Sequence, residues 1–290
     1  MTTKDLILER FGSLSVKLQE AARFVVDHPN DVVISSMRAL AERAGAQPAT
    51  FVRLAQQLGF AGWPELKAAV AADLGLQGKR YGERAKALTS RGRDAGLAAE
   101  LFAAQRHNLE LTASECAPSL RAAARLLRKA RTVHVAGFRA SYPIAYSLYY
   151  GYRLFRPSVQ LVHDQAGGLD MALRAVDKPD ALVAISFAPY SREALRVATA
   201  GKAAGAAVVG LTDSAASPLA LVSNVSVLFS IASPSFFPSV AAGIAVTEAL
   251  LEILVAEGGS DIPDIIDRSE KELFESGAYV LPPAKRPSRR

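Results

Sequence analysis

The sequence predicts a multidomain protein in which an all-α domain is followed by an α/β domain with a doubly wound parallel sheet. From residue 4 to about residue 76, apolar residues recur every three or four positions, which is the period of amphipathic helices. After residue 117, short runs rich in β-branched residues alternate with helical stretches. Repeated strand–helix units of this kind build a parallel sheet covered by helices on both faces.

The chain divides into four expected segments, and its 290 residues suit about two domains of ~150 residues each. We expect a helical domain at 1–76, a basic hinge with a connecting helix at 77–117, the α/β domain at 118–278 and a disordered basic tail at 279–290. Residues 79–131 carry twelve basic and five acidic side chains, whereas residues 1–78 carry eight of each. The net charge of +6 therefore arises near the hinge and does not by itself indicate a nucleic-acid partner.

Cysteine and histidine usage excludes several classes of site. A single cysteine, Cys116, excludes an intrachain disulfide, and four scattered histidines give no zinc pattern, so no metal or cofactor is expected. The first residues lack the apolar core of a signal peptide. The most apolar stretch, 240–256, contains Glu248 and Glu252, so it does not read as a membrane span. We expect a soluble, cytoplasmic protein without a membrane partner.

Two short helices joined by a glycine turn are the informative feature of the first domain. Gly45 ends the first helix, and Pro48 suits the first turn of the second. The spacing turns two apolar sets inward: Met37, Leu40, Ala41 and Ala44 from the first helix, and Phe51, Leu54, Ala55 and Leu58 from the second. Thr50, Arg53 and Gln57 remain on the outer face of the second helix, as in a helix-turn-helix that reads the major groove.

The outer residue types suit base contacts. Arg can pair two acceptors on guanine, Gln can pair adenine, and Thr suits a thymine methyl group or a phosphate. No acidic residue occurs between Arg43 and Pro64, so this edge is locally positive. An ordinary helical hairpin with a solvated polar face, or one that binds another protein, gives the same pattern.

The segment 14–70 contains three distinctive runs: Leu40-Ala41-Glu42-Arg43-Ala44-Gly45, Ala49-Thr50-Phe51-Val52-Arg53 and Leu58-Gly59-Phe60-Ala61-Gly62-Trp63-Pro64-Glu65-Leu66-Lys67. Through these runs the segment resembles the N-terminal domain of RpiR/MurR-type bacterial transcriptional regulators. It implies that Thr50 and Arg53 lie on a recognition helix. The family often has Ser where this chain has Gln47, so the usual hydroxyl N-cap is missing. We count Gln47, Pro48, Gln57 and Lys67 as further DNA-contacting positions.

Five β-rich runs are expected to form the sheet: 132–136, 159–163, 181–187, 206–212 and 225–230. The first ends at Gly137 and leads through Arg139 and Ser141 into a helix. A glycine at a strand end before a helix places backbone N–H groups at the carboxyl edge of the sheet, where they can hold an anion. Gly137, Arg139 and Ser141 are therefore candidate ligand-binding residues.

The loop after the third strand supplies Ser186 and Ser191, and Ser191 is also placed to cap the next helix. Residues 120–257 resemble the sugar isomerase (SIS) fold, the usual C-terminal partner in this regulator family. The resemblance implies a sugar-phosphate cradle of the form Ser-x-Ser-Gly-x-Thr/Ser. This chain has Ala188 and Pro189 where the motif has Ser and Gly, so two donors are lost. We expect a weakened phosphate site, and a less charged acid is an alternative ligand.

The resulting expectation is a DNA-binding regulator whose SIS-type domain senses a sugar phosphate or related acid and controls binding to a double-stranded operator. A homodimer or higher homo-oligomer is expected, with the helix at 240–256 a possible interface. The alternative is a sugar-phosphate isomerase with an accessory helical domain. His163, Glu248 and Glu252 are the available bases, but no recognisable acid/base pair accompanies them, so no catalysis is expected.

Overall fold

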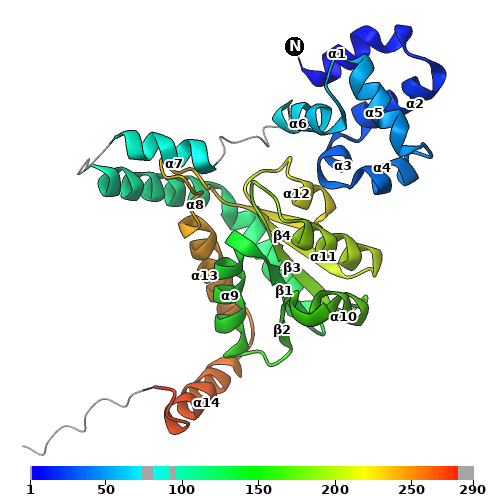
Figure 1. Cartoon of the computed structure of the whole chain (residues 1–290). Helices are drawn as coiled ribbons and strands as arrows, with labels where there is room; N and C mark the ends of the chain where they lie inside the picture. Colours follow the sequence, from blue (N-terminus) through cyan, green and yellow to red (C-terminus); the bar gives the residue numbers. More distant parts are fainter. Residues whose placement is uncertain (1, 74–80, 92–95, 280–290) are drawn as a thin grey trace, which may run out of the picture.

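The computed structural model describes residues 2–73, 81–91 and 96–279 and contains a helical domain and an α/β domain, with two further helices between them in the sequence (Figure 1). The expected disordered tail at 279–290 lies outside the described residues except for Tyr279. Within the described residues, no helix is both long and apolar enough to span a bilayer.

The first domain is all helical, as predicted. Its helices surround a core that includes Phe51, Leu54 and Trp63, with the rings of Phe51 and Trp63 in edge contact at 5.1 Å. The helices are α1 (Thr3–Arg10), α2 (Val16–Asp27), α3 (Pro29–Ile34), α4 (Met37–Arg43), α5 (Pro48–Gln57) and α6 (Trp63–Asp73).

Two helices follow the first domain, α7 (Tyr81–Ser90) and α8 (Leu97–Lys129). Helix α8 has 33 residues and contains Pro118, so it runs through the position where we expected the α/β domain to begin. A proline inside a helix costs about 3 kcal/mol or more. The helix continues because its second half packs against α13 and the sheet through Leu120, Ala124 and Leu127.

The second domain is a five-stranded parallel sheet in the order β2-β1-β3-β4-β5. All five predicted runs form strands, and the doubly wound α/β prediction is confirmed. The elements are β1 (Val133–Gly137), α9 (Tyr142–Arg153), β2 (Val159–Val162), α10 (Gly168–Ala175), β3 (Ala181–Ile185), α11 (Arg192–Ala203), β4 (Ala207–Thr212), α12 (Pro218–Val222), β5 (Val225–Leu228), α13 (Ala241–Ala256) and α14 (Ile262–Glu275).

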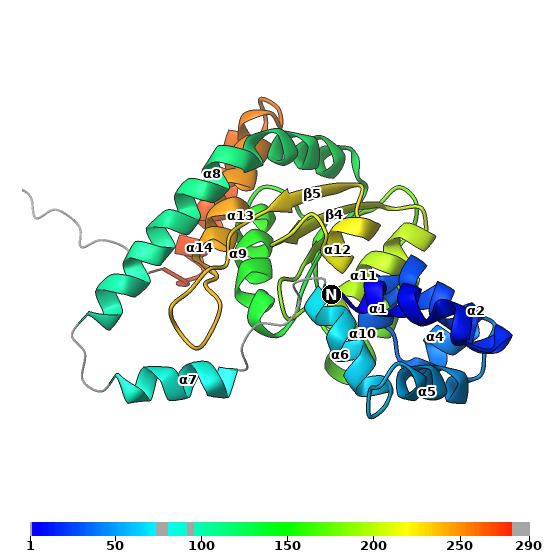
Figure 2. The same cartoon turned by 90° about the horizontal axis from the view of Figure 1, so that it is seen from above.

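Helices cover both faces of this sheet (Figure 2). One core lies between the sheet and α8, α9 and α13, and the other lies under α10, α11 and α12. Helix α13 packs against α8 and α9, and its Val246, Leu250 and Leu254 are buried in the chain's own core. These residues are therefore not free to form the oligomer interface suggested for 240–256, whereas Glu248 and Glu252 are exposed.

A cluster of ionisable side chains around the buried Asp180 lies at the amino edge of the sheet. The Asp180 carboxylate accepts hydrogen bonds from Nε and Nη2 of Arg131, each at 3.0 Å. Nε2 of His134 is 3.7 Å from Asp180, too long for a hydrogen bond, and neither ring nitrogen has a hydrogen-bond partner among the described residues. His134 is 3% exposed, and this burial lowers its pKa.

Candidate functional site

Helices α4 and α5 form the turn that the sequence predicts. Gly45 adopts a φ of 62°, a left-handed conformation that glycine enters without a Cβ clash. Pro48 occupies the first turn of α5. Gln47 has extended backbone at the N-cap position, but its side chain makes no capping hydrogen bond and is exposed.

Helix α5 presents a polar face on the surface of the first domain. Arg53 and Gln57 are exposed and Thr50 is half-buried, whereas Phe51, Leu54 and Ala55 on the opposite face are fully buried. None of the described residues forms an ion pair or side-chain hydrogen bond with Arg53. The structure thus brings together three of the predicted DNA-contacting residues on one accessible helix.

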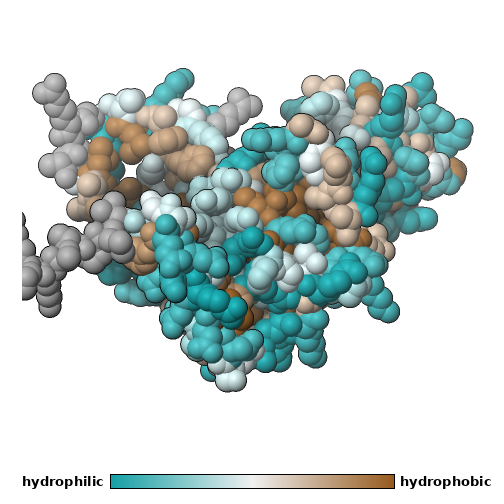
Figure 3. Space-filling view, turned by 90° about the horizontal axis from the view of Figure 1, so that it is seen from below, coloured by the Kyte–Doolittle hydropathy of each residue, from teal (hydrophilic) through white to brown (hydrophobic). Residues whose placement is uncertain are grey.

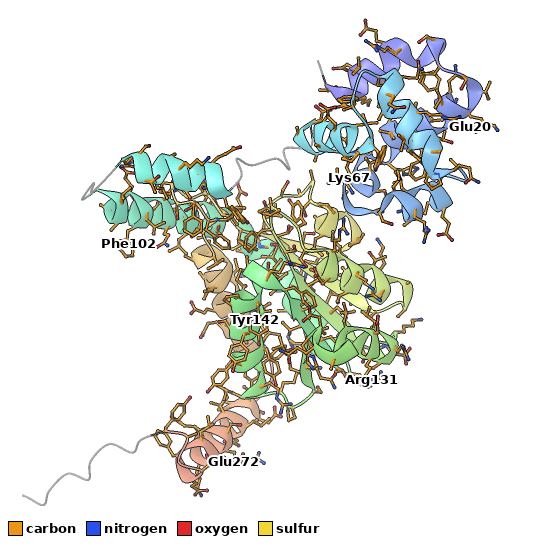
Figure 4. All side chains as sticks on the ribbon, viewed as in Figure 1. Glu20, Lys67, Phe102, Arg131, Tyr142 and Glu272 are labelled. Carbon is orange, nitrogen blue, oxygen red and sulfur yellow. The ribbon has the colours of Figure 1, made fainter. Side chains whose placement is uncertain are left out.

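Lys67 lies apart from this face, on α6 (Figure 4). Its ammonium group donates a hydrogen bond to the carbonyl of Ser35 at 2.8 Å. Burial, together with the nearby Arg192 of the second domain, lowers the Lys67 pKa. Lys67 therefore joins α6 to the segment before α4, a structural role that the sequence did not indicate.

The order β2-β1-β3 places a topological switch point at the carboxyl ends of β1 and β3, the usual ligand position in such sheets. A pocket of about 650 Å³ opens at this edge. Its lining combines one buried aromatic wall with several charged and polar groups: Phe138, Arg139, Tyr142, Leu161, Val162, His163, Asp164, Gln165 and Glu193.

Of the five predicted ligand-binding residues, Arg139 lines this pocket. Gly137 and Ser141 form the turn behind it, where a Cβ on Gly137 would lie 2.7 Å from the Ser141 carbonyl oxygen. Ser186 and Ser191 bind each other: the Ser191 backbone N–H donates to Ser186 Oγ at 2.9 Å. Ser191 also caps α11 by accepting from the Ala194 N–H, as predicted.

Sequence reasoning did not assign the residues after β2 to the ligand pocket and named His163 only as an available base. His163, Asp164 and Gln165 are exposed in the pocket lining. Tyr142, the first residue of α9 (Figure 4), lines the same pocket. The available signal was topological, because the carboxyl end of every parallel strand reaches the same edge. Glu248 and Glu252 do not line the pocket.

Glu193 links the loops after β1 and β3. Its carboxylate accepts hydrogen bonds from Arg139 Nη2 and from Ser191 Oγ, each at 2.7 Å. The bond from Arg139 is the main cause that lowers the Glu193 pKa to about 2. In the same loop, Tyr190 donates its hydroxyl to Asp213 at 2.9 Å. Burial and that carboxylate raise the Tyr190 pKa.

Comparison with known protein families now assigns both domains. Residues 6–77 match the helix-turn-helix domain of the rpiR family, and residues 126–253 match the SIS domain. The chain belongs to the RpiR family of transcriptional regulators. It is a DNA-binding regulator with an SIS-type ligand-binding domain, as the sequence resemblance predicted.

Two curated relatives are named as HTH-type transcriptional regulators. The HTH-type transcriptional regulator HexR of Pseudomonas aeruginosa is 28% identical over 224 residues, which cover 76% of each chain. An HTH-type transcriptional regulator of Caldanaerobacter subterraneus is 23% identical, and the match covers 78% of this chain and 79% of that protein.

Solved structures agree on the fold of the RpiR-family chain. Vibrio vulnificus NanR complexed with ManNAc-6P superposes with a TM-score of 0.59 at 20% identity and covers 94% of this chain and all of its own. The sugar isomerase domain of the Sphaerobacter thermophilus RpiR transcription factor gives a TM-score of 0.58 at 20% identity, covering 62% of this chain and 99% of that one.

Proposed function

We propose that this RpiR-family regulator reads its operator through α5, with Thr50, Arg53 and Gln57 in the major groove. The observation that carries this proposal is the exposed Arg53 on a helix whose other face is fully buried. An unpaired guanidinium can form two hydrogen bonds with one guanine. Gln47 and Pro48 lie at the N-terminus of the same helix, where backbone N–H groups of residues other than Pro48 suit a phosphate contact.

The effector pocket is the hollow at the carboxyl edge of β1, β2 and β3. Its Arg139, His163 and Gln165 supply polar groups for a small anionic metabolite, and the aromatic rings of Phe138 and Tyr142 supply apolar surface. The effector class is a sugar phosphate or a related acid. NanR, which shares the fold, is complexed with ManNAc-6P, and this supports the sugar-phosphate option.

A chain of contacts leads from the loop after β3 through the loop after β5 to helix α8. The ring of Phe187, next to Ser186, packs edge-on against the ring of Phe229, with 6.0 Å between the ring centroids. The following residue, Ser230, donates its N–H to Thr112 of α8 at 3.0 Å. Asn108 of α8 is fully buried and donates to the Ala232 carbonyl at 2.7 Å.

These contacts join the loop after β5 to α8. A movement of the loop after β3 on effector binding can therefore be transmitted through α8 and α7 to the helix-turn-helix domain. A coupling of about 1–3 kcal/mol is sufficient to switch operator occupancy. A homodimer would present two helix-turn-helix domains to two half-sites of the operator, as is common for helix-turn-helix proteins. The protein is proposed to act in the cytoplasm.

The proposed role includes no catalysis. An isomerase needs a free base next to the reacting carbons. Glu193 is ionised but held by Arg139 and Ser191, and His163 and Asp164 are exposed at the pocket rim. The alternative, a sugar-phosphate isomerase, predicts turnover of phosphorylated sugars, and measurable turnover would overturn the regulatory assignment of this pocket.

The experiment that tests the whole proposal is a selection of genomic DNA fragments bound by the full-length protein, with and without cell extract. We expect enrichment of one sequence family, and a change in its enrichment when extract is present. Binding should weaken as salt rises, because phosphate contacts release counterions. A failure to enrich any fragment would refute the DNA-binding assignment, whereas enrichment that is insensitive to every extract would refute effector control.

A further inference from the structure

Glu193 lines the pocket between the loops that follow β1 and β3. It belongs to the first turn of α11 and is half-buried, with 22% of its side chain exposed. Its two carboxylate oxygens take one hydrogen bond from the loop after β1 and one from the loop after β3. A carboxylate of the chain itself therefore already accepts two hydrogen bonds to an ionised group at the switch point, one from Arg139 and one from Ser191.

The groups bound by Glu193 are the ones that an effector anion would need. Among the described residues that line the pocket, Arg139 carries the only permanent positive charge. Its φ of 54° is uncommon for a residue with a Cβ, and such backbone conformations cluster at ligand clamps. Ser191 supplies the hydroxyl that the cradle retains from the family motif. Both are engaged by the same carboxylate.

The other donors of the loop after β3 are also engaged within the chain. The Ala188 N–H points at Asp213 at 3.4 Å, and the Ser191 N–H donates to Ser186 Oγ. Pro189 has no N–H to offer. An incoming phosphate therefore finds Arg139 and the donors of the loop after β3 paired with Glu193, Asp213 or Ser186.

We propose that Glu193 is an internal competitor for the effector: its carboxylate takes the anion position on Arg139 and Ser191, and an anionic ligand binds by displacing it. This inference rests on the proposed effector pocket and adds the residue that sets its affinity. Because the exposed fraction of the Arg139 side chain is 75%, its guanidinium is free to turn toward a ligand once Glu193 is displaced.

The competitor is permanently charged under physiological conditions. Since the Glu193 pKa is held at about 2, the carboxylate stays ionised at any pH that the folded protein meets in a cell. The pocket therefore discriminates against weakly held monoanions and favours dianions or ligands with additional contacts to the residues after β2.

The test uses the full-length protein, the variant Glu193→Gln and inorganic phosphate as the probe, titrated by isothermal calorimetry. Glutamine keeps the size and the acceptor toward Ser191 but removes the charge that holds Arg139. We expect the phosphate Kd to fall at least tenfold in Glu193→Gln, and we expect this gain to vanish in the double variant Glu193→Gln/Arg139→Ala. If the glutamine variant does not fold, Glu193→Ala must show the same gain.

The matched control is Asp170→Asn, which breaks another ion pair of α11, that between Arg196 and Asp170. It should leave the phosphate Kd unchanged. Equal phosphate affinity in the wild type and Glu193→Gln would overturn the competitor role while leaving the pocket in place. Absence of phosphate binding in both proteins would also overturn it. The wider function would then still be decided by whether cell extract alters operator binding of the wild type.

Discussion

Replacing Arg53 by alanine tests the DNA-reading face with little risk to the fold. The Arg53 side chain is exposed and has no ion-pair or hydrogen-bond partner among the described residues, so its loss should change stability by less than about 0.5 kcal/mol. A bidentate contact with guanine is worth about 1–3 kcal/mol. At about 1.4 kcal/mol for each factor of ten, the operator Kd should rise roughly 5- to 150-fold.

The assay is fluorescence anisotropy with the selected operator and a scrambled fragment, each measured over a range of salt concentrations. Arg53→Lys separates the two kinds of contact, because it keeps the charge but loses the planar fork. If Arg53 reads a base, Arg53→Lys should lose most of the specificity yet keep the salt dependence. Unchanged operator affinity in Arg53→Ala would refute the assignment of α5, and a uniform loss on both fragments would assign Arg53 to a phosphate.

Three further predictions concern stability. Leu54→Ala empties a fully buried site behind α5, so it should destabilise the helical domain by about 2–5 kcal/mol in urea unfolding. His134 has a pKa lowered by burial, so the unfolded chain binds a proton that the native chain excludes. The free energy of unfolding should therefore be undiminished by His134 above pH ~6.5 and should decline as the pH falls below that value. His134→Leu should make the free energy of unfolding less dependent on pH in this range. Gly137→Ala puts a Cβ 2.7 Å from the Ser141 carbonyl oxygen, which should cost about 1–3 kcal/mol and weaken effector binding in calorimetry.

Two of these stability predictions have a control on the same chain. Leu221 is 53% exposed, so Leu221→Ala should leave the unfolding curve nearly unchanged. A Cβ on Gly82 would meet no atom within 4 Å, so Gly82→Ala should not destabilise. A stable Leu54→Ala, a His134→Leu variant with an unchanged pH slope, or a Gly137→Ala variant with normal stability and effector affinity would each contradict the packing on which the prediction depends.

Because Val246, Leu250 and Leu254 of α13 are buried within the chain, a search for self-association is better directed first at exposed apolar residues. Hydrophobic surface is visible toward the end of the molecule that holds α7 and α8 (Figure 3). Phe102 of α8 is 67% exposed and Phe236 of the loop after β5 is 47% exposed. Such exposed aromatic side chains are a reasonable first target for substitutions tested by light scattering.

Local patterns in the sequence determined most of the architecture. Five β-rich runs became the five strands, and the three central ones are largely apolar at successive positions because a strand buried on both faces of a parallel sheet must be so. The three-to-four spacing set which face of α5 is buried, and Gly45 with Pro48 set the turn. These signals lie within a few residues of one another, so they can be read without the fold.

Only the tertiary structure decided which residues share the pocket. Glu193 and Arg139 are 54 positions apart, and their contact depends on β1 and β3 lying side by side and on one rotamer of each side chain. The β2 loop enters the pocket because the sheet order places β2 next to β1. Helix α8 likewise passes through Pro118 because packing against α13 outweighs a local helix-breaking preference. Strand order and long-range packing fix such contacts, and neither has a local signature in the sequence.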